Sequence, residues 1–315
     1  MVKFNPQDTG TDQVVCPQTL VARSHECDYP PTFVRDVPML TSQKTQFNPN
    51  AENPAKDIDE QVRKALASGN SLYNLDVDQL KDLQPDVVLT QSLCEVCSID
   101  LVTVERVVLK MKIPAKVLDL NPKTLGEVVD DIQRIGEVIG CEEGASKVVK
   151  ELRERIERAK TKRARPPKVA FFEWTDPIYV GGHWTPEIIE MAGGIHLLNV
   201  PGGKSKAVHD EEFVAHDPDI IMVAPCGMDL PKTRDLVKHI ENDLKRGEWF
   251  KSLRAFKSGK VCLVDGNEMF NRPGPRLVDS LEFCRALFDS FDSLKADEPF
   301  PATAIPFKFP WEPYI

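Results

Sequence analysis

Cysteine, histidine and glutamate gather in short turns that follow apolar segments of this 315-residue chain. One such turn, LCEVCS (93–98), contains a Cys-x-x-Cys motif with a glutamate between the thiols. Thiolate and imidazole groups bind metal ions, and a thiolate next to an imidazole can act as a nucleophile. Three kinds of site are therefore possible: a metal centre, a thiol-dependent active site, or a pocket whose walls these side chains only shape.

The candidate ligand-binding residues share one position, directly after a predicted strand, where ligands bind in parallel α/β sheets. Trp174 and Trp184 would offer flat contact surfaces, and the two arginines of the RPGPR turn (272–276) would meet carboxylates. The full set is Ser24, His25, Glu26, Cys27, Cys94, Glu95, Cys97, Glu173, Trp174, Gly182, His183, Trp184, Cys226, Phe270, Arg272 and Arg276.

A metal site would draw on the thiols and imidazoles of this set. Structural zinc has a closed shell of four Cys and His ligands, and an H-x-C pair is a weak complement to the Cys-x-x-Cys motif. A redox pair is a weaker hypothesis, because the surroundings typical of thioredoxin are missing. The possible metal ligands are His25, Cys27, Cys94, Cys97 and His183.

An enzyme would use the same groups differently. Cys27 or Cys94 would supply a thiolate, His25 or His183 the base, and a neighbouring glutamate would orient the imidazole. A bound metal that activates water is a further variant. The chain has no glycine-rich phosphate loop and no dinucleotide-binding fingerprint.

The composition excludes several classes of protein. Hydrophobic residues make up 41% and charged residues 28%, as in soluble globular proteins. Acidic residues outnumber basic ones by 49 to 40, and the net charge of −9 opposes binding to nucleic acid or anionic membranes. The N-terminal residues do not read as a signal peptide, and no apolar run would span a membrane. We therefore expect a cytoplasmic protein, with Cys16, Cys141, Cys262 and Cys284 as buried thiols.

Alternation of strands and helices predicts an α/β fold with mainly parallel sheets. Strands are expected over TLVAR (19–23), DVVLTQ (86–91), AKVLDL (115–120), KVAFFEW (168–174), DIIMVAP (219–225) and KVCLVDG (260–266). Two similar segments, LQPDVVLTQSLC (83–94) and HDPDIIMVAPCG (216–227), suggest two lobes of similar construction. A capping-box spacing at Thr124 and Glu127 opens one helix, and a longer helix follows.

The predicted organisation has five parts. They are an irregular segment 1–18, an N-terminal lobe 19–141, a long helix 142–166, a C-terminal lobe 167–294 and a strap 295–315 rich in proline and aromatic residues.

Several strings together resemble one protein class over about residues 19–290: RSHECDYPP, LQPDVVLTQSLCEVC, VAFFEWTDPIYVGGHWTPEIIEMAGG and VDGNEMFNRPGPRLVDSLE. This class is the helical-backbone (class III) substrate-binding proteins of cobalamin and ferric-siderophore ABC importers, and in particular a subgroup of cobalamin-binding-like proteins without a signal. The resemblance implies two α/β lobes joined by one long helix, with the ligand in the cleft between them. It also implies that the N-terminal lobe lacks its usual first strand-helix unit.

The resulting hypothesis is non-catalytic binding of a cobalamin-like corrinoid or related metal chelate, with His25 or His183 close to the metal centre. Cobalamin would be the ligand and not a resident cofactor. Without a signal peptide, we do not expect an ABC importer as partner. The alternatives are a Cys/His/Glu-dependent or metal-dependent enzyme, and a bare metal-ion receptor or metallochaperone. A visible absorption spectrum would distinguish a bound chelate from a bare zinc ion.

Overall fold

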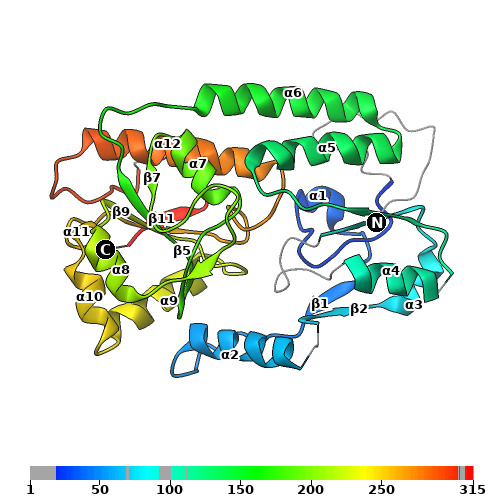
Figure 1. Cartoon of the computed structure of the whole chain (residues 1–315), viewed down its shortest axis with the longest axis horizontal. Coiled ribbons are helices and arrows are strands. Elements are labelled where there is room, and N and C mark those ends of the chain that lie inside the picture. The colour runs from blue at the N-terminus through cyan, green and yellow to red at the C-terminus, as the bar shows by residue number, and fades with distance from the viewer. Residues whose placement is uncertain are drawn as a thin grey trace. The chain divides into compact units, whose positions relative to one another are not determined.

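The computed structural model describes residues 19–68, 71–91, 101–110, 112–303, 305 and 309–314, with the backbone alone for 101–103. The chain forms two compact units, whose elements are labelled in Figure 1. Unit 1 consists of Met1–Pro49, Asp57–Pro122 and Asp130–Glu151, and unit 2 of Asn50–Lys56, Lys123–Val129 and Leu152–Ile315. The boundary falls inside helix α6 (Glu142–Ala159), which occupies most of the predicted long helix.

Unit 1 contains two small sheets among its described residues. Strands β3 (Val87–Thr90) and β4 (Lys116–Asp119) are parallel, with Val87 opposite Lys116. Strands β1 (Thr41–Gln43) and β2 (Tyr73–Leu75) form an antiparallel pair. The remaining elements of this part of the chain are α1 (Pro31–Val34), α2 (Pro54–Ala67), α3 (Val77–Leu83), α4 (Leu101–Lys110) and α5 (Leu125–Ile139).

The core of unit 1 explains why these short elements hold together. Leu40, Leu80, Val88 and Val108 come from a loop, two helices and a strand, and all are buried in one cluster. Each such side chain contributes about 1.5–3 kcal/mol when it leaves water. Packing therefore stabilises helices that are too short to persist alone.

Two expectations for unit 1 are wrong. The segment 19–23 is not a regular strand, because Arg23 makes only an isolated parallel bridge to Met39. Cys141 is not a buried thiol: it is half-buried and disulfide-bonded, and its partner lies outside the described residues. Cys262 and Cys284, in contrast, are buried and free.

Unit 2 is built on a seven-stranded sheet with the order β11-β10-β9-β5-β6-β8, and β7 pairs with β5 off this path. Strands β10, β9 and β5 are parallel neighbours, as is β7 with β5, whereas β6, β8 and β11 are antiparallel to theirs. The strands are β5 (Lys168–Thr175), β6 (Ile178–Val180), β7 (Ile195–His196), β8 (Lys206–Ala207), β9 (Ile220–Val223), β10 (Val261–Val264) and β11 (Trp311–Pro313). The predicted α/β class is confirmed.

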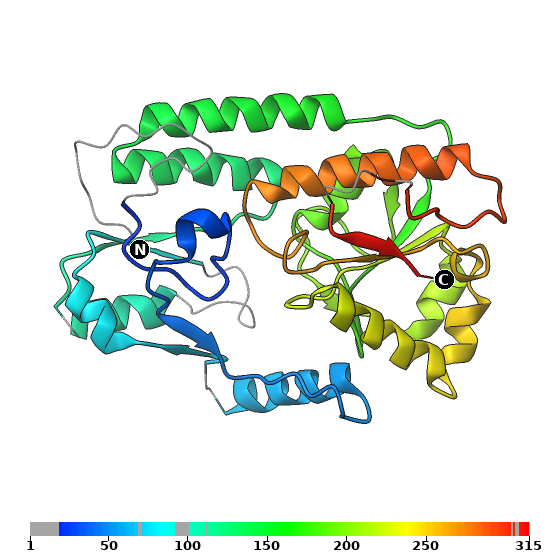
Figure 2. The same cartoon turned by 180° about the vertical axis from the view of Figure 1, so that it is seen from behind.

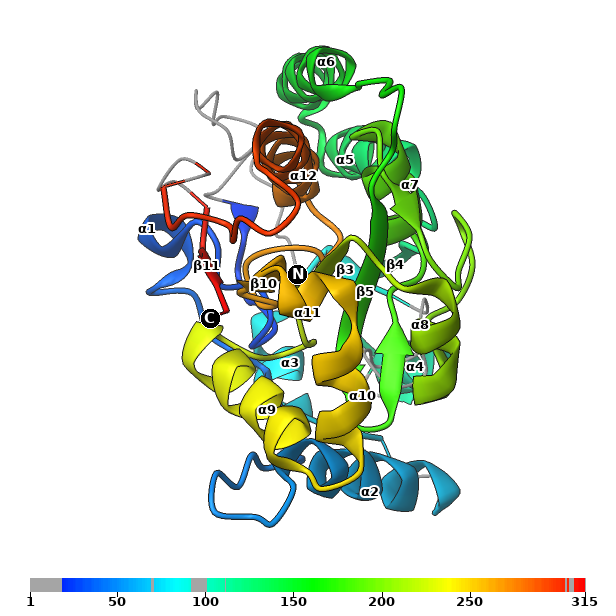
Figure 3. The same cartoon turned by 90° about the vertical axis from the view of Figure 1, so that its left-hand side faces the viewer.

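Helices cover both faces of this sheet, with α7 and α12 on one face and α9 and α10 on the other (Figure 3). Figure 2 shows β11 in red across the front of unit 2, and in the strand order β11 is one edge of the sheet. The helices of unit 2 after α6 are α7 (Thr185–Met191), α8 (Asp210–His216), α9 (Leu230–Asn242), α10 (Arg246–Ser252), α11 (Arg254–Lys257) and α12 (Arg276–Ser293).

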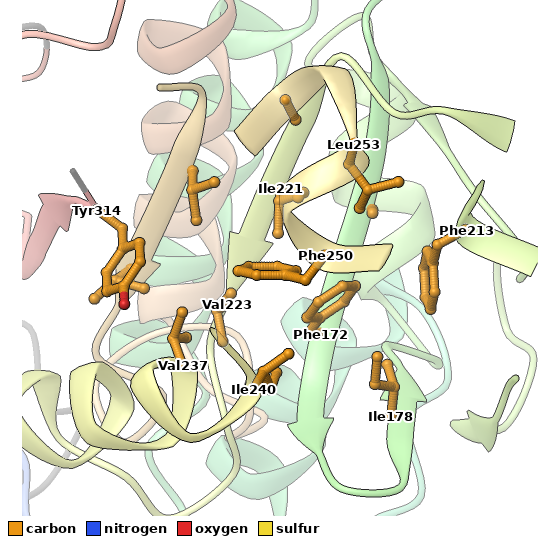
Figure 4. Packing of buried hydrophobic residues seen from close by; sticks show 14 of the residues in the cluster. Phe172, Ile178, Phe213, Ile221, Val223, Val237, Ile240, Phe250, Leu253 and Tyr314 are labelled. Carbon is orange, nitrogen blue, oxygen red and sulfur yellow. The ribbon is translucent and has the colours of Figure 1, made fainter. Parts of the chain in front are cut away.

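Adjacent phenylalanines in β5 show how strand alternation builds both layers. The ring of Phe172 lies 4.9 Å from that of Phe213 and 6.5 Å from that of Phe250, on the side of α8 and α10 (Figure 4). The ring of Phe171 lies 5.0 Å from that of Phe270, which in turn packs on Phe283 of α12. Because helices pack on both faces, β9 (IIMV), β10 (VCLV) and the centre of β5 (residues 169–172) are apolar, as the sequence suggested.

Among the described residues, no helix combines the length and the apolar character needed to cross a membrane.

Candidate functional site

The turn that holds four of the predicted site residues lies in unit 1. The His25 Nδ1 atom is 2.6 Å from the Thr41 hydroxyl, and its Nε2 atom is 3.3 Å from a Glu26 carboxylate oxygen. The Ser24 hydroxyl lies 3.3 Å from the Cys27 sulfur, which is exposed. The turn thus has internal contacts of its own.

Three predicted residues, Cys94, Glu95 and Cys97, lie outside the described residues. Within the described part of the chain, no group of three or more His, Cys, Asp and Glu side chains is arranged to hold a metal ion. The metal-ion receptor hypothesis stays a prediction, because two of its five proposed ligands are in the segment that is not described.

In unit 2, the loops at the carboxyl ends of β5, β9 and β10 meet. The Cys226 backbone N–H donates to the Glu173 carbonyl at 3.1 Å, and the Ser205 hydroxyl donates to the Glu173 carboxylate at 2.9 Å. Parallel strands end at one edge of the sheet, so their following turns are neighbours. The sequence singled out both Glu173 and Cys226 as residues at strand ends, but it gave no sign of Ser205.

Asn271 links the ends of β9 and β10. Its side-chain amide donates to the Ala224 carbonyl at 2.8 Å and to the Gly266 carbonyl at 3.0 Å. A Cβ atom on Gly266 would come within 2.0 Å of the Pro225 carbonyl oxygen, so this close approach requires glycine. Asn271 lies within a predicted turn, but its role depends on contacts that the sequence does not reveal.

The GGHW turn packs against the PGGKS segment (201–205). The His183 N–H donates to the Gly203 carbonyl at 2.6 Å, and the Gly202 N–H donates to the His183 carbonyl at 2.9 Å. At Gly182, an added Cβ atom would lie 2.3 Å from the Ser205 nitrogen. The two glycine-containing turns therefore form one paired structure, which explains the glycine at position 182.

The imidazole of His183 has an unusual environment. His183 has a φ of 52°, in the left-handed region, and its Nδ1 atom is buried without a hydrogen-bond partner in the described structure. Burial, together with the positive charges of Lys204 and Lys123, lowers the pKa of His183 from 6.5. The ring is therefore neutral at pH 7, with one of its two nitrogens unprotonated. Neither lysine was predicted from the sequence.

Two of the predicted aromatic residues belong to the core instead. Only 3% of Trp184 and 1% of Phe270 is exposed. The Trp184 indole N–H donates to the Phe270 carbonyl at 2.5 Å, so its polar atom is also used internally. This burial corrects the expectation that Trp184 presents a flat face to a ligand.

Trp174 is half-buried and contacts a segment from earlier in the chain. Its indole N–H donates to the Ala55 carbonyl at 3.2 Å, and the nearby Asp176 accepts from the Asn53 amide at 2.6 Å. The Arg246 guanidinium lies 3.1 Å from Asp176 and donates to the Thr175 carbonyl at 2.9 Å. Residues 50–56 are thus fixed to the end of β5 within unit 2.

The two arginines of RPGPR differ in their partners. Arg272 donates to the Asn267 side chain at 3.3 Å, and Arg276 lies 3.8 Å from Glu268. Arg276 is the first residue of α12 and bridges this helix to the turn after β10. Both side chains are partly buried.

These contacts connect the loops into one structure, which we call the carboxyl rim: residues Glu173, Gly182–Trp184, Gly203–Ser205, Ala224–Cys226, Gly266 and Phe270–Arg272. Ser205 joins Glu173, Glu173 joins Cys226, Asn271 joins the ends of β9 and β10, and Trp184 joins Phe270. Of the predicted residues, the rim unites Glu173, Gly182, His183, Trp184, Cys226, Phe270 and Arg272.

A shallow hollow lies away from the rim, between α6 and α12, with about 500 Å³ of open space. Charged side chains line it, but they are paired: Arg155 binds Asp279 and Glu282, and Arg285 donates to the Arg158 carbonyl. These pairs join two helices of unit 2 and give the hollow a structural explanation.

Relatives of known name match part of the chain. A vitamin B12-binding protein of Vibrio cholerae serotype O1 is 23% identical over 170 residues, which is 53% of this chain and 57% of the relative. A vitamin B12-binding protein of Photorhabdus laumondii is 27% identical over 180 residues, 56% of this chain and 59% of the relative. The chain therefore spans less than two thirds of the length of these relatives.

Solved structures show the same fold. A periplasmic vitamin B12 binding protein of Vibrio cholerae has a TM-score of 0.59 at 18% identity, over 88% of this chain and 91% of that one. A periplasmic heme binding protein of Pseudomonas aeruginosa has a TM-score of 0.61 at 18% identity, over 88% of this chain and 86% of that one.

The family model described as periplasmic binding protein matches residues 39–268, which is more than half of the chain. The chain therefore belongs to the periplasmic binding protein family.

Proposed function

We propose that this chain binds a cobalamin-like corrinoid or a related metal chelate such as haem, without transforming it, and that the carboxyl rim forms part of the binding surface. The names of the relatives, vitamin B12-binding and heme-binding proteins, support this class of ligand. Within the chain, the observation that carries the proposal is the hydrogen-bonded rim that holds polar groups at the carboxyl edge of the sheet.

The rim is rigid enough to be preformed. Its loops are joined by side-chain and backbone hydrogen bonds of 2.5 to 3.1 Å, among them those of Trp184, Asn271 and Glu173. A preformed site loses little conformational entropy when a ligand binds. This suits a large, flat ligand that meets several loops at once.

His183 supplies the group suited to a metal centre. A neutral imidazole is a common ligand of transition metals, including the iron of haem. The lowered pKa keeps the ring unprotonated at pH 7, so no proton must be removed before it coordinates a metal. Its left-handed backbone, held between two glycine-containing turns, fixes where the ring lies.

The cations around His183 suit the edges of such a ligand. Lys204 is exposed, and Lys204 and Lys123 both act electrostatically on His183. Haem carries propionate carboxylates, and cobalamin carries a phosphodiester. Attraction between these anions and the lysines would orient the chelate.

The test is a visible-absorption titration with hydroxocobalamin, haemin and a ferric siderophore. We expect at least one to bind, and the His183→Ala variant to bind about tenfold more weakly or to lose the spectral shift of an axial imidazole. His216→Ala, at an exposed histidine on α8, is the matched control and should bind like the wild type. Absence of binding by all three compounds would refute the proposed ligand class, whereas binding unaffected by His183→Ala would refute the role of the rim histidine.

A further inference from the structure

The end of the chain covers one edge of the unit 2 sheet. Strand β11 pairs with β10 in antiparallel register, with Leu263 opposite Glu312. The Tyr314 N–H donates to the Val261 carbonyl at 2.9 Å, and the Asp265 N–H donates to the Pro310 carbonyl at 3.0 Å. Without β11, the apolar strand β10 would expose a row of unpaired backbone groups, which is a template for pairing with another chain.

The other side of β11 offers no backbone donor to a further strand. The backbone hydrogen-bonding groups of residues 310, 312 and 314 point towards β10. By strand alternation, the backbone groups of Trp311 and Pro313 point away from β10. Pro313 has no N–H, and the N–H of Trp311 is bonded to the Phe309 carbonyl at 3.0 Å. The segment thus replaces an edge with donors and acceptors by one that offers only acceptors and pairs less readily.

Side chains of α9 fix β11 in place. Arg234 lies 2.7 Å from Glu312 and 5.8 Å from the ring centroid of Tyr314. The Tyr314 hydroxyl donates to the Glu241 carboxylate at 2.5 Å. Tyr314, directly after β11, is only 6% exposed, so this end of the segment is both buried and hydrogen-bonded.

A second attachment lies at the start of β10. The Lys260 ammonium donates to the carbonyls of Lys295 and Glu298 and lies 5.8 Å from the ring centroid of Phe300. Lys260 is 2% exposed, so these groups replace the water that it loses. The segment 295–314, of which the structure describes 295–303, 305 and 309–314, is therefore attached at two points.

We propose that this C-terminal segment is an edge guard that keeps the chain monomeric, and that its displacement lets the β10 edge pair with that of a second copy. Antiparallel pairing of two β10 strands about Leu263 would be two-fold symmetric and would place Val261 opposite Asp265. The strand VCLV carries no charge to oppose this pairing. A second copy presents the same strand and needs no other partner.

Light scattering of the full chain and of a chain ending at Pro301 tests this proposal. The full chain should be a monomer. The shortened chain should be a dimer in which the Leu263 amide stays protected from hydrogen exchange, and a peptide of residues 303–315 added in trans should return it to a monomer. A shortened chain that is folded by circular dichroism yet monomeric, or a full chain that is already a dimer, would overturn the proposal.

A full-length double variant, Arg234→Ala with Tyr314→Ala, covers the case in which the shortened chain does not fold. We expect about tenfold faster exchange of the Leu263 and Asp265 amides and a dimer that grows with concentration. The exposed residues Lys238 and Asn242 of α9 provide the matched control, Lys238→Ala with Asn242→Ala. A double variant that stays monomeric and whose amide hydrogen exchange is unchanged would contradict the proposal of an edge guard.

Discussion

The two ends of the unit 2 sheet use positive charge in opposite ways. At the amino end, the buried Lys260 is enclosed by carbonyls and aromatic rings, and Arg163 is paired with Asp289 and Asp292. At the carboxyl end, Lys204 is exposed and acts on the neutral His183.

The difference distinguishes cations that stabilise the fold from cations that can bind a ligand. A buried cation must be satisfied by the protein itself, because desolvation otherwise costs several kcal/mol. An exposed cation remains available to an anionic ligand. We therefore expect substitutions at the amino end to change stability, and substitutions in the carboxyl rim to change binding.

The largest effect should come from Lys260→Ala at the amino end. The substitution leaves carbonyls that have lost their donor and a cavity beneath Phe300, at a cost of about 3–4 kcal/mol in the free energy of unfolding. Lys257→Ala, at an exposed position of α11, should change it by less than about 0.5 kcal/mol. Urea unfolding measures both, and equal effects would show that Lys260 is not a structural cation.

Acid should destabilise unit 2 through His196, which is 5% exposed in β7. Burial lowers its pKa from 6.5 to about 4, and an interaction with the Asn199 backbone opposes this shift only in part. The unfolded chain binds this proton first as the pH falls, so stability is full above pH 6.5 and is lost towards pH 4. The loss approaches about 3 kcal/mol for this one group.

His196→Phe should remove that part of the pH dependence of unfolding, whereas His216→Gln, at an exposed histidine, should keep it. If the wild type and His196→Phe lose stability in parallel between pH 6.5 and 4, the assignment to His196 is wrong.

Asn271→Ala changes a residue of the carboxyl rim that should matter for both stability and ligand binding. It removes two hydrogen bonds that join the ends of β9 and β10 and should cost about 2 kcal/mol in stability. Because the rim loops lose their connection, chelate binding should weaken as well. Asn242→Ala, at the exposed end of α9, should alter neither property in calorimetry and titration.

The smallest effect concerns the charge near His183. In Lys204→Gln, the pKa of His183 should rise towards 6.5, because one of the cations that disfavour its protonation is gone. NMR titration of the imidazole resonances measures this shift, with Lys206→Gln as the control. An unchanged or lower pKa would mean that Lys204 does not act on the ring.

The sequence was sufficient for the central strands. Runs rich in apolar residues located β3, β4, β5, β9 and β10, and every residue of β9 and β10 is buried, as expected of strands covered on both faces. It did not locate the strands of two or three residues, such as β7 and β8, because so few positions show no alternation. The tail was expected to be a surface strap, but Trp311–Pro313 adds a strand to the sheet.

For the candidate site, strand ends were a good guide to position but not to side-chain direction. Glu173 and Cys226 meet because the topology makes their strands neighbours. Trp184 and Phe270 follow strands too, yet they turn into the core through a hydrogen bond between distant segments. Lys204 and Asn271 act through such distant contacts as well, and no local motif marks them.

One measurement tests the central claim most directly: the dissociation constants of hydroxocobalamin and haemin for two charge reversals, one at each end of the sheet. Lys204→Glu changes the carboxyl rim, and Lys162→Glu makes the same change at an exposed position near the amino end. We predict that Lys204→Glu weakens binding of the chelate about tenfold or more while Lys162→Glu leaves it unchanged. Equal dissociation constants for the two variants would contradict the assignment of ligand binding to the carboxyl rim.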